Sequence, residues 1–223
     1  MAARARGFTL IEIAIVLVII GLLLGGILKG QELLTAARVR NIIQQQEQYK
    51  TAFIGFQDRY RNPPGDYAQA TANIKDVAPG PCGTPNPDGN GNGNNRVEAT
   101  GSENTLAWEH LSKAGFITVV YTCATTVGAG TSPRNRYEQP LEIVFDDQYA
   151  GTAPARHNLK TGGRIPSNLL AEVDRKIDDG VATTGEFRAA LATGITATEC
   201  YAAATGAWQA DNPGNNCMGA SLF

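Results

Sequence analysis

One short segment has the residue types and the spacing of a calcium-binding loop. In the run Asp88-Gly-Asn90-Gly-Asn92-Gly, oxygen-bearing side chains recur at every second position and glycine allows the chain to turn, which suits a hard cation. The second half departs from this pattern, because the twelfth position is Ala99 and Glu98 comes one residue early. The segment therefore predicts either a calcium site at Asp88, Asn90 and Asn92 or a flexible Asn/Gly loop. The sequence indicates no cofactor that the protein requires.

The remaining polar residues show no arrangement typical of an enzyme. The sequence has no G-x-S-x-G nucleophile elbow, no H-E-x-x-H zinc motif and no phosphate-binding loop. His110 is expected on a helix surface and His157 in a loop, both in contact with water. Asp174, Asp178 and Asp179 could bind a cation together, but such a group is more typical of a solvated helix end. We therefore expect that the protein is not an enzyme.

The four cysteines, Cys82, Cys123, Cys200 and Cys217, indicate disulfides rather than a metal site. None forms a C-x-x-C pair, and both histidines are far from any pair of them, so zinc spacing is absent. If the chain after its N-terminal segment is exported, an even number of scattered cysteines predicts two disulfides. Three connectivities exist, and we favour Cys82–Cys123 with Cys200–Cys217 because neighbours in sequence close first.

The N-terminal segment is apolar over a length that can span a membrane. From Phe8 to Leu28 nearly every residue is apolar, and Glu12 is the only charge. Arg4 and Arg6 precede this run, and a short basic flank before about twenty apolar residues is typical of a spanning helix whose N-terminus is cytoplasmic. The whole chain has a net charge of -2 and a pI near 5.7, which does not favour nucleic acid.

Two ordinary explanations of this segment are incomplete. A cleavable secretory signal has a shorter apolar core and a small-residue cleavage site after it, whereas this run continues into Lys29-Gly-Gln-Glu32. A plain signal anchor explains the arginines and the length but leaves Glu12 without a role. An unpaired carboxylate near the centre of a spanning helix costs about 2.5 kcal/mol or more, so a partner is expected.

Residues 1–12, MAARARGFTLIE, resemble the class III leader of type IV pilins and of the pseudopilins of type II secretion. The resemblance implies that a prepilin peptidase cuts between Gly7 and Phe8 on the cytoplasmic side and methylates Phe8. It also implies that Glu12 pairs with the N-terminal ammonium of a neighbouring subunit. Two opposite charges on adjacent subunits would relieve each other's desolvation in hydrocarbon and set the register of assembly.

The function that the resemblance implies is that of a structural subunit, a pilin or pseudopilin, assembled into a helical filament. The implied partners are copies of the chain, other pilin-like subunits, the prepilin peptidase and the bacterial inner membrane. The head would lie in the periplasm, and in a filament or at the cell surface after assembly. The alternative is a monomeric, membrane-anchored periplasmic binding domain that carries the same leader.

One departure from the family pattern concerns flexibility. Many members carry a proline where this chain has Lys29, and here the helix interior instead contains Gly21, Gly25, Gly26 and Gly30. Each interior glycine costs about 1 kcal/mol relative to alanine. We therefore expect local bending or melting near Gly25 and Gly26.

After Lys29 the helical pattern becomes amphipathic. The residues of one stripe recur at steps of three and four: Ile42, Gln46, Tyr49, Phe53, Phe56 and Tyr60. The helix is expected to stop at Asn62, because Pro63-Pro-Gly65 cannot continue it. The expected organisation is a leader at 1–7, a membrane or filament-core helix at 8–28, an amphipathic helix at 29–62 and a globular head at 63–223.

Within the head, the sequence predicts two helices, two strands and long loops. The segment from Pro63 to Gly101 is mostly loop, and the tail from Gly194 to Phe223 is loop-rich. The predicted elements are a helix at Thr105–Ala114, strands at Phe116–Tyr121 and Leu141–Phe145, and a helix capped by Ser167 that reaches Ile177. Together with the resemblance, this order predicts an α+β fold: a long N-terminal helix packed on a small antiparallel-sheet head with a disulfide-closed C-terminal region.

Overall fold

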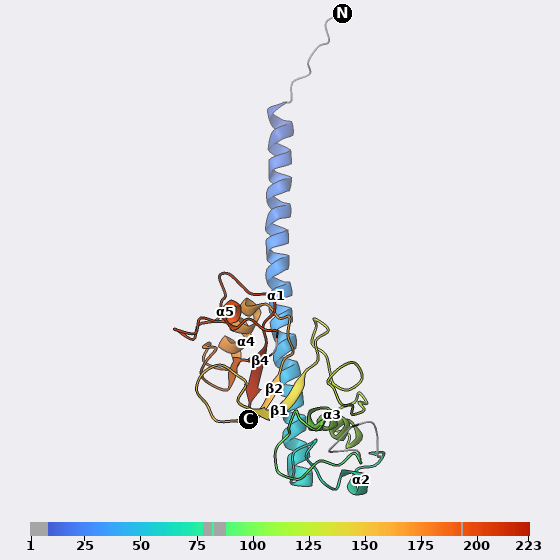
Figure 1. Cartoon of the computed structure of the whole chain (residues 1–223). Coiled ribbons are helices and arrows are strands. Elements are labelled where there is room, and N and C mark those ends of the chain that lie inside the picture. Colours follow the sequence, from blue (N-terminus) through green and yellow to red (C-terminus); the bar gives the residue numbers. More distant parts are fainter. Residues whose placement is uncertain (1–8, 78–81, 83–87, 193) are drawn as a thin grey trace, which may run out of the picture. The chain divides into compact units, whose positions relative to one another are not determined.

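The computed structural model describes residues 9–77, 82, 88–192 and 194–223 (Figure 1). The chain divides into two compact units, Met1–Arg38 and Val39–Phe223. Helix α1 (Leu10–Tyr60) contributes its first part to one unit and its second part to the other. Its end at Tyr60 lies close to the predicted stop before Pro63-Pro-Gly65, where two prolines prevent further helical hydrogen bonding.

From Leu10 to Leu28 in the first unit, α1 is apolar on every side apart from Glu12. Its large apolar side chains between Leu10 and Leu34 are 46–89% exposed, and a helix with no polar face requires a membrane or other protein around it. Among the described residues, α1 is the one helix whose length and composition suit a membrane span. The helix is continuous through Gly25 and Gly26, so the single chain has no break at the predicted flexible point.

In the second unit, the amphipathic stripe of α1 packs on the head as predicted. Ile42, Gln46, Phe53 and Phe56 are buried, and Tyr49 packs edge-to-face on Trp108 with ring centroids 5.0 Å apart. These contacts bury large apolar side chains, each of which contributes about 1.5–3 kcal/mol. The apolar period of α1 therefore attaches the helix to the head.

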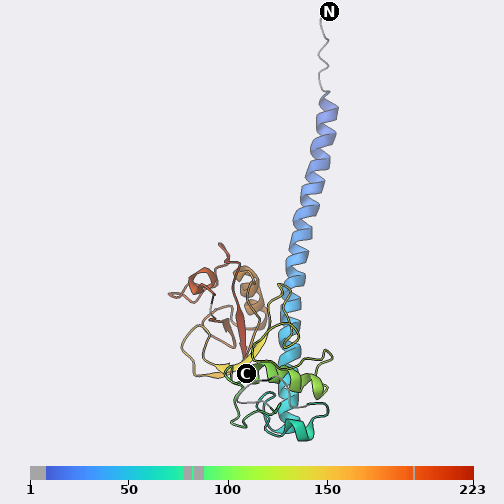
Figure 2. The same cartoon turned by 45° about the vertical axis from the view of Figure 1, so that its right-hand side comes forward.

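The head contains a four-stranded antiparallel sheet of order β1-β2-β4-β3 (Figures 1 and 2). Its strands are β1 (Glu142–Asp146), β2 (Arg156–Lys160), β3 (Phe187–Ala189) and β4 (Gly219–Leu222). Ile143 is paired with Leu159, and Leu159 in turn with Ser221. The α+β class is confirmed, and β1 lies one residue later than the strand predicted at Leu141–Phe145. Strand β4 lies inside the tail that was predicted to be loop.

The second predicted strand, Phe116–Tyr121, is wrong. The following backbone N–H groups bind side chains of α3 (Glu103–Lys113) instead of a strand: Tyr121 N donates to Ser112 Oγ at 3.2 Å and Cys123 N to Glu109 Oε2 at 2.7 Å. Phe116 N also donates to the carbonyl oxygen of Leu111 at 2.9 Å, so both ends of the run are bonded to α3 rather than to a strand. It remains a loop that exposes its valines.

Among its described residues, the head also contains the helices α2 (Ala70–Asn73), α3 (Glu103–Lys113), α4 (Ser167–Ile177) and α5 (Ala197–Cys200). Helix α3 contacts β1 and α4 contacts β3, so the two longer helices lie at opposite edges of the sheet. The bounds predicted for α4 are correct, but the predicted cap is wrong. Pro166 occupies the N-cap position, and Ser167 Oγ donates to the carbonyl oxygen of Gln209 at 2.6 Å.

The cysteines form two disulfides, Cys82–Cys123 and Cys200–Cys217, with Cα–Cα distances of 5.1 and 5.6 Å. This is the pairing that their order in the sequence favours. On the loop-entropy model, each bridge stabilises the fold by about 3–4 kcal/mol. The first attaches the loop before α3 to the loop after it, and the second closes the C-terminal region.

Candidate functional site

The N-terminus of α1 is closed by a capping box. Thr9 lies directly before the helix, and its backbone N–H and its hydroxyl donate to Glu12 Oε2 at 2.7 and 2.8 Å. In return, Glu12 N donates to Thr9 Oγ1 at 3.3 Å. The T-x-x-E spacing in the sequence is the signal that predicts such a box. The predicted processing residues Gly7 and Phe8 lie outside the described residues.

The capping box leaves Glu12 able to accept a further donor. Each bond to the carboxylate uses Oε2, and Oε1 has no partner among the described residues. The carboxylate also lies in the first turn of α1, where the helix dipole favours negative charge. The geometry therefore presents one anionic oxygen, held in place by Thr9, to a cationic group from outside the chain.

The predicted calcium ligands are engaged with protein donors. Asn90 donates to both carboxylate oxygens of Asp88, through its backbone N at 3.2 Å and its Nδ2 at 3.1 Å. Asn90 Oδ1 accepts from the backbone N of Thr71 at 3.0 Å, and Asn92 Oδ1 accepts from Asn94 N at 2.9 Å. A calcium ion would have to displace these donors, and a site at Asp88, Asn90 and Asn92 stays a prediction.

A buried carboxylate organises this Asn/Gly loop. Asp66 is fully buried and accepts from three successive backbone N–H groups, those of Gly93 at 2.7 Å, Asn94 at 3.0 Å and Asn95 at 2.6 Å. A Cβ at Gly91 would collide with the Asp66 backbone, so glycine is required there. Burial raises the pKa of Asp66 above its usual range. No local sequence pattern predicts this role.

Glu103, at the start of α3, holds the same loop from the other side. It is fully buried and accepts from Asn92 N and from Glu98 N, each at 3.0 Å. Burial is the main cause that raises the pKa of Glu103 to about 6. The loop therefore supplies N–H donors to two buried carboxylates.

The acidic group at the end of α4 is also hydrogen-bonded within the protein. Asp174, Asp178 and Asp179 have oxygen atoms within 4.8 Å of one another. Asp174 Oδ2 accepts from Trp208 Nε1 at 2.6 Å, and Asp179 Oδ2 accepts from the Thr184 hydroxyl at 2.5 Å. The prediction of a helix end is confirmed, but Asp174 is fully buried rather than solvated, and burial raises its pKa to about 6.

Two predictions are wrong: His110 is buried rather than on a helix surface, and His157 lies in a strand rather than in a loop, with its ring partly buried. His110 is fully buried in α3, where Nδ1 accepts from Gly65 N and Nε2 lies 3.0 Å from the carbonyl oxygen of Gly89. His157 lies in β2, with its ring centroid 5.1 Å from that of Phe145. Neither imidazole contacts a carboxylate, hydroxyl or thiol among the described residues, so neither forms a nucleophile–base pair.

The buried histidines predict a measurable pH dependence. Burial lowers the pKa of His110 and of His157 to about 4, whereas an unfolded histidine titrates near about 6.5. Between these values the unfolded chain binds protons and the folded chain does not, so stability falls as pH decreases from about 6.5 to 4. Glu103 and Asp174 act oppositely, because their raised pKa values add stability at low pH that is lost as pH rises through about 6.

Histidine-resolved NMR titration of the full chain in detergent micelles measures the pKa values of His110 and His157. Both imidazoles should remain neutral down to about pH 4, with the proton of His110 on Nε2. The urea-unfolded chain is the control and should titrate near about 6.5. A folded-state midpoint near that value for either ring would contradict its burial.

Comparison with known proteins characterises the N-terminal segment. Residues 2–28 match a family model described as the prokaryotic N-terminal methylation motif. No curated protein and no solved structure matches the chain. The match covers the basic leader, Glu12 and the apolar first part of α1.

Proposed function

Because the chain carries the class III prepilin leader of type IV pilins and pseudopilins, we propose that it is a structural subunit of a type IV pilus or a type II secretion pseudopilus. The observation that carries this proposal is the methylation motif at residues 2–28, followed without interruption by an apolar helix. The leader and the helix fit an inner-membrane-anchored protein with an extramembrane head. Proteins with this motif are structural rather than enzymatic.

In the proposed maturation, a prepilin peptidase cuts between Gly7 and Phe8 and methylates Phe8. Glu12 then pairs with the N-terminal ammonium of a neighbouring subunit. The capping box supports this role, because it fixes the carboxylate and leaves Oε1 for the incoming cation. In an apolar filament core, this ion pair can form at only one axial offset between neighbouring subunits. The pair would therefore favour assembly at that offset.

Packing between copies is supported by the glycines of α1. Gly21 and Gly25, and likewise Gly26 and Gly30, have the small-x-x-x-small spacing that lets helices approach closely in apolar surroundings. A Cβ at any of these four positions would meet nothing within 4 Å in the single chain. The space beside them is thus open to a neighbouring helix.

We place the head in the periplasm before assembly and on the filament surface afterwards. The two disulfides support an oxidising compartment, because such bridges are rare in the bacterial cytoplasm. The partners in this proposal are copies of the chain, other pilin-like subunits, the prepilin peptidase and the inner membrane.

Mass spectrometry of the N-terminus of the protein from its natural host tests the proposal. The expected N-terminal residue is methylated Phe8, and a Gly7→Val control should retain the leader, because a bulky residue replaces the glycine at the cut. An intact Met1 in the wild-type chain, or a start well beyond Phe8, would instead support an anchored monomer or a secreted domain.

A further inference from the structure

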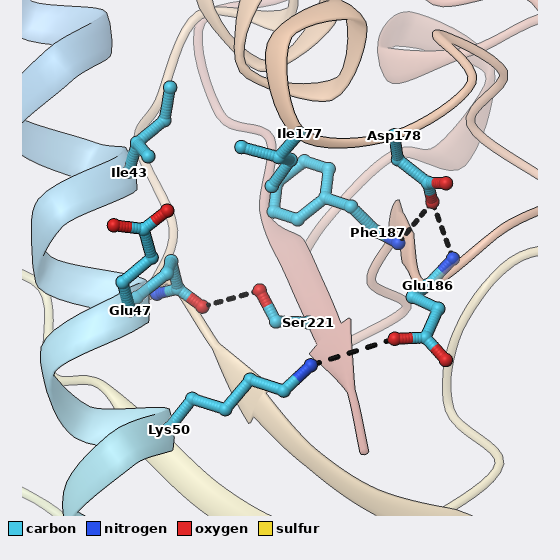
Figure 3. A pocket seen from close by; sticks show the side chains of 9 residues that line it. Ile43, Glu47, Lys50, Ile177, Asp178, Glu186, Phe187 and Ser221 are labelled. Carbon is cyan, nitrogen blue, oxygen red and sulfur yellow. Dashed lines mark hydrogen bonds and ion pairs between the residues drawn. The ribbon is translucent and has the colours of Figure 1, made fainter.

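A small pocket in the head lies beside the second part of α1 (Figure 3). It encloses about 210 Å³, which is below the about 300–1,000 Å³ typical of pockets for cofactors and drug-sized ligands. It is lined from α1, the end of α4, the start of β3 and the middle of β4, by Ile43, Gln46, Glu47, Lys50, Ile177, Asp178, Glu186, Phe187 and Ser221. Its volume suits a single amino-acid side chain.

The lining combines apolar walls with an excess of negative charge. Ile43, Ile177 and Phe187 supply the apolar surface, and Ile177 is 40% exposed. The one ammonium group, that of Lys50, is already matched: Nζ lies 3.6 Å from Glu186 Oε2 and donates to the carbonyl oxygen of Leu222 at 3.2 Å. A long apolar side chain with a cationic end therefore fits the pocket.

Glu47 is the carboxylate that is free to bind such a cation. It is exposed and has no hydrogen bond or ion pair within the part of the chain that the structure describes. The second lining carboxylate, Asp178, accepts from the backbone N–H groups of Glu186 and Phe187. In Figure 3, Glu47 lies on α1 between Ile43 and Lys50, with its carboxylate directed along the helix toward Ile43.

The chain itself presents a matching cation on the same face of α1. Arg40 is exposed and has no partner among the described residues. It precedes Glu47 by seven residues, which places the two about 10 Å apart along the helix axis and about 20° apart around it. A parallel neighbour displaced by about two helical turns would therefore bring its own Arg40 level with Glu47.

We propose that this pocket receives the Arg40 side chain of a second copy, with the guanidinium on Glu47 and the aliphatic stem against Ile43, Ile177 and Phe187. The two complementary surfaces differ and lie on the same chain, so the contact is heterologous and repeats from copy to copy. Such a contact generates an open helical filament unless the rotation closes it into a ring. The inference rests on the proposed function, since it needs parallel copies in an assembly.

Charge exchange in full-length protein, produced in its natural host, tests the contact. The single variants Glu47→Arg and Arg40→Glu should each lower the yield of sheared filaments about tenfold or more, because each places like charges at the interface. The double variant should recover to within about threefold of the wild type, because it restores the pair in the opposite order. Immunoblots of cell extracts should show equal amounts of processed subunit in all variants.

Two control variants change charge elsewhere on α1. Asp58→Arg alters another exposed carboxylate, and Arg38→Glu combined with Glu47→Arg alters an arginine half a turn away from the Arg40 face. Asp58→Arg should leave the filament yield unchanged. Arg38→Glu should not restore the filament yield that Glu47→Arg lowers.

The possible results separate the inference from the function on which it rests. If the wild type forms filaments and both single variants give the same filament yield, the Arg40–Glu47 contact is overturned. The proposed role as a subunit then stays intact. If the single variants lose filaments and the double variant does not regain them, the Arg40–Glu47 contact is also overturned. That result would indicate a different occupant of the pocket, such as another pilin-like subunit. Absence of wild-type filaments and of a processed N-terminus would overturn the proposed function itself.

Discussion

Replacing Glu12 with glutamine is expected to reduce filament assembly by about a hundredfold or more while the leader is still removed. In the proposed filament, the ammonium of one subunit and the carboxylate of its neighbour lie in an apolar core. Removing one charge leaves the other unpaired there, at a cost of about 3–5 kcal/mol. Glutamine can still accept from Thr9, so the variant isolates the charge from the capping function.

The measurement is the yield of sheared filaments relative to processed subunit in the membrane. Thr9→Val is the matched control, because it removes the hydroxyl of the capping box but keeps the carboxylate. Loss of a helix cap costs about 1 kcal/mol, so this control should lower the yield by less than about tenfold. Normal assembly of the Glu12→Gln protein would overturn the role given to this charge.

Replacing Asp66 with alanine is expected to destabilise the head by about 2 kcal/mol or more. The substitution removes the acceptor of Asn95 N and one of the two acceptors of Gly93 N and of Asn94 N. A hydrogen bond to a charged group contributes about 1.5–3 kcal/mol. Since a domain of this size loses about 2–4 °C in Tm per kcal/mol, the Tm should fall by about 4 °C or more.

Thermal unfolding followed by circular dichroism, on full-length protein in detergent, measures this effect. Asp58→Ala is the control, because that carboxylate is exposed on α1 and has no partner among the described residues. It should change the Tm by less than about 2 °C. Equal Tm values for the two variants would show that water replaces Asp66 as the acceptor for these N–H groups.

The features that the sequence predicts well are those with a local cause. Helix α1 follows from an apolar run and a three-four repeat, and its end follows from Pro63-Pro-Gly65. Helix α3 and strand β1 also have local apolar patterns. The disulfide pairing follows from the order of the cysteines along the chain.

The features that the sequence does not predict depend on distant partners. Strands β2, β3 and β4 have three to five residues, and runs such as Arg156–Lys160 and Gly219–Leu222 carry no alternation strong enough to identify them. Conversely, Phe116–Tyr121 resembles a strand, but side chains of α3 accept from the backbone N–H groups at its last residue and just beyond it. Pairing across the fold, rather than local propensity, decides these cases.

The same distinction applies to the candidate site. The leader, Glu12 and the apolar helix are contiguous, so their pattern is visible in thirty residues. The carboxylate of Asp66 is about thirty residues from the N–H groups that it binds, and the burial of His110 depends on Gly65 and Gly89. Nothing near these residues in the sequence marks them as buried.

The place of β4 in the sheet has a consequence for the order of biogenesis. Strand β3 is paired with β4 alone, and β4 also covers the second edge of β2. If the head is translocated as proposed, β1 and β2 cross first and can form a hairpin early, but within the described part of the chain β3 has no strand to join until residues 219–222 have crossed the membrane. In that case translocation must be nearly complete before the head matures, and until then the subunit would be a substrate for chaperones and proteases rather than for assembly.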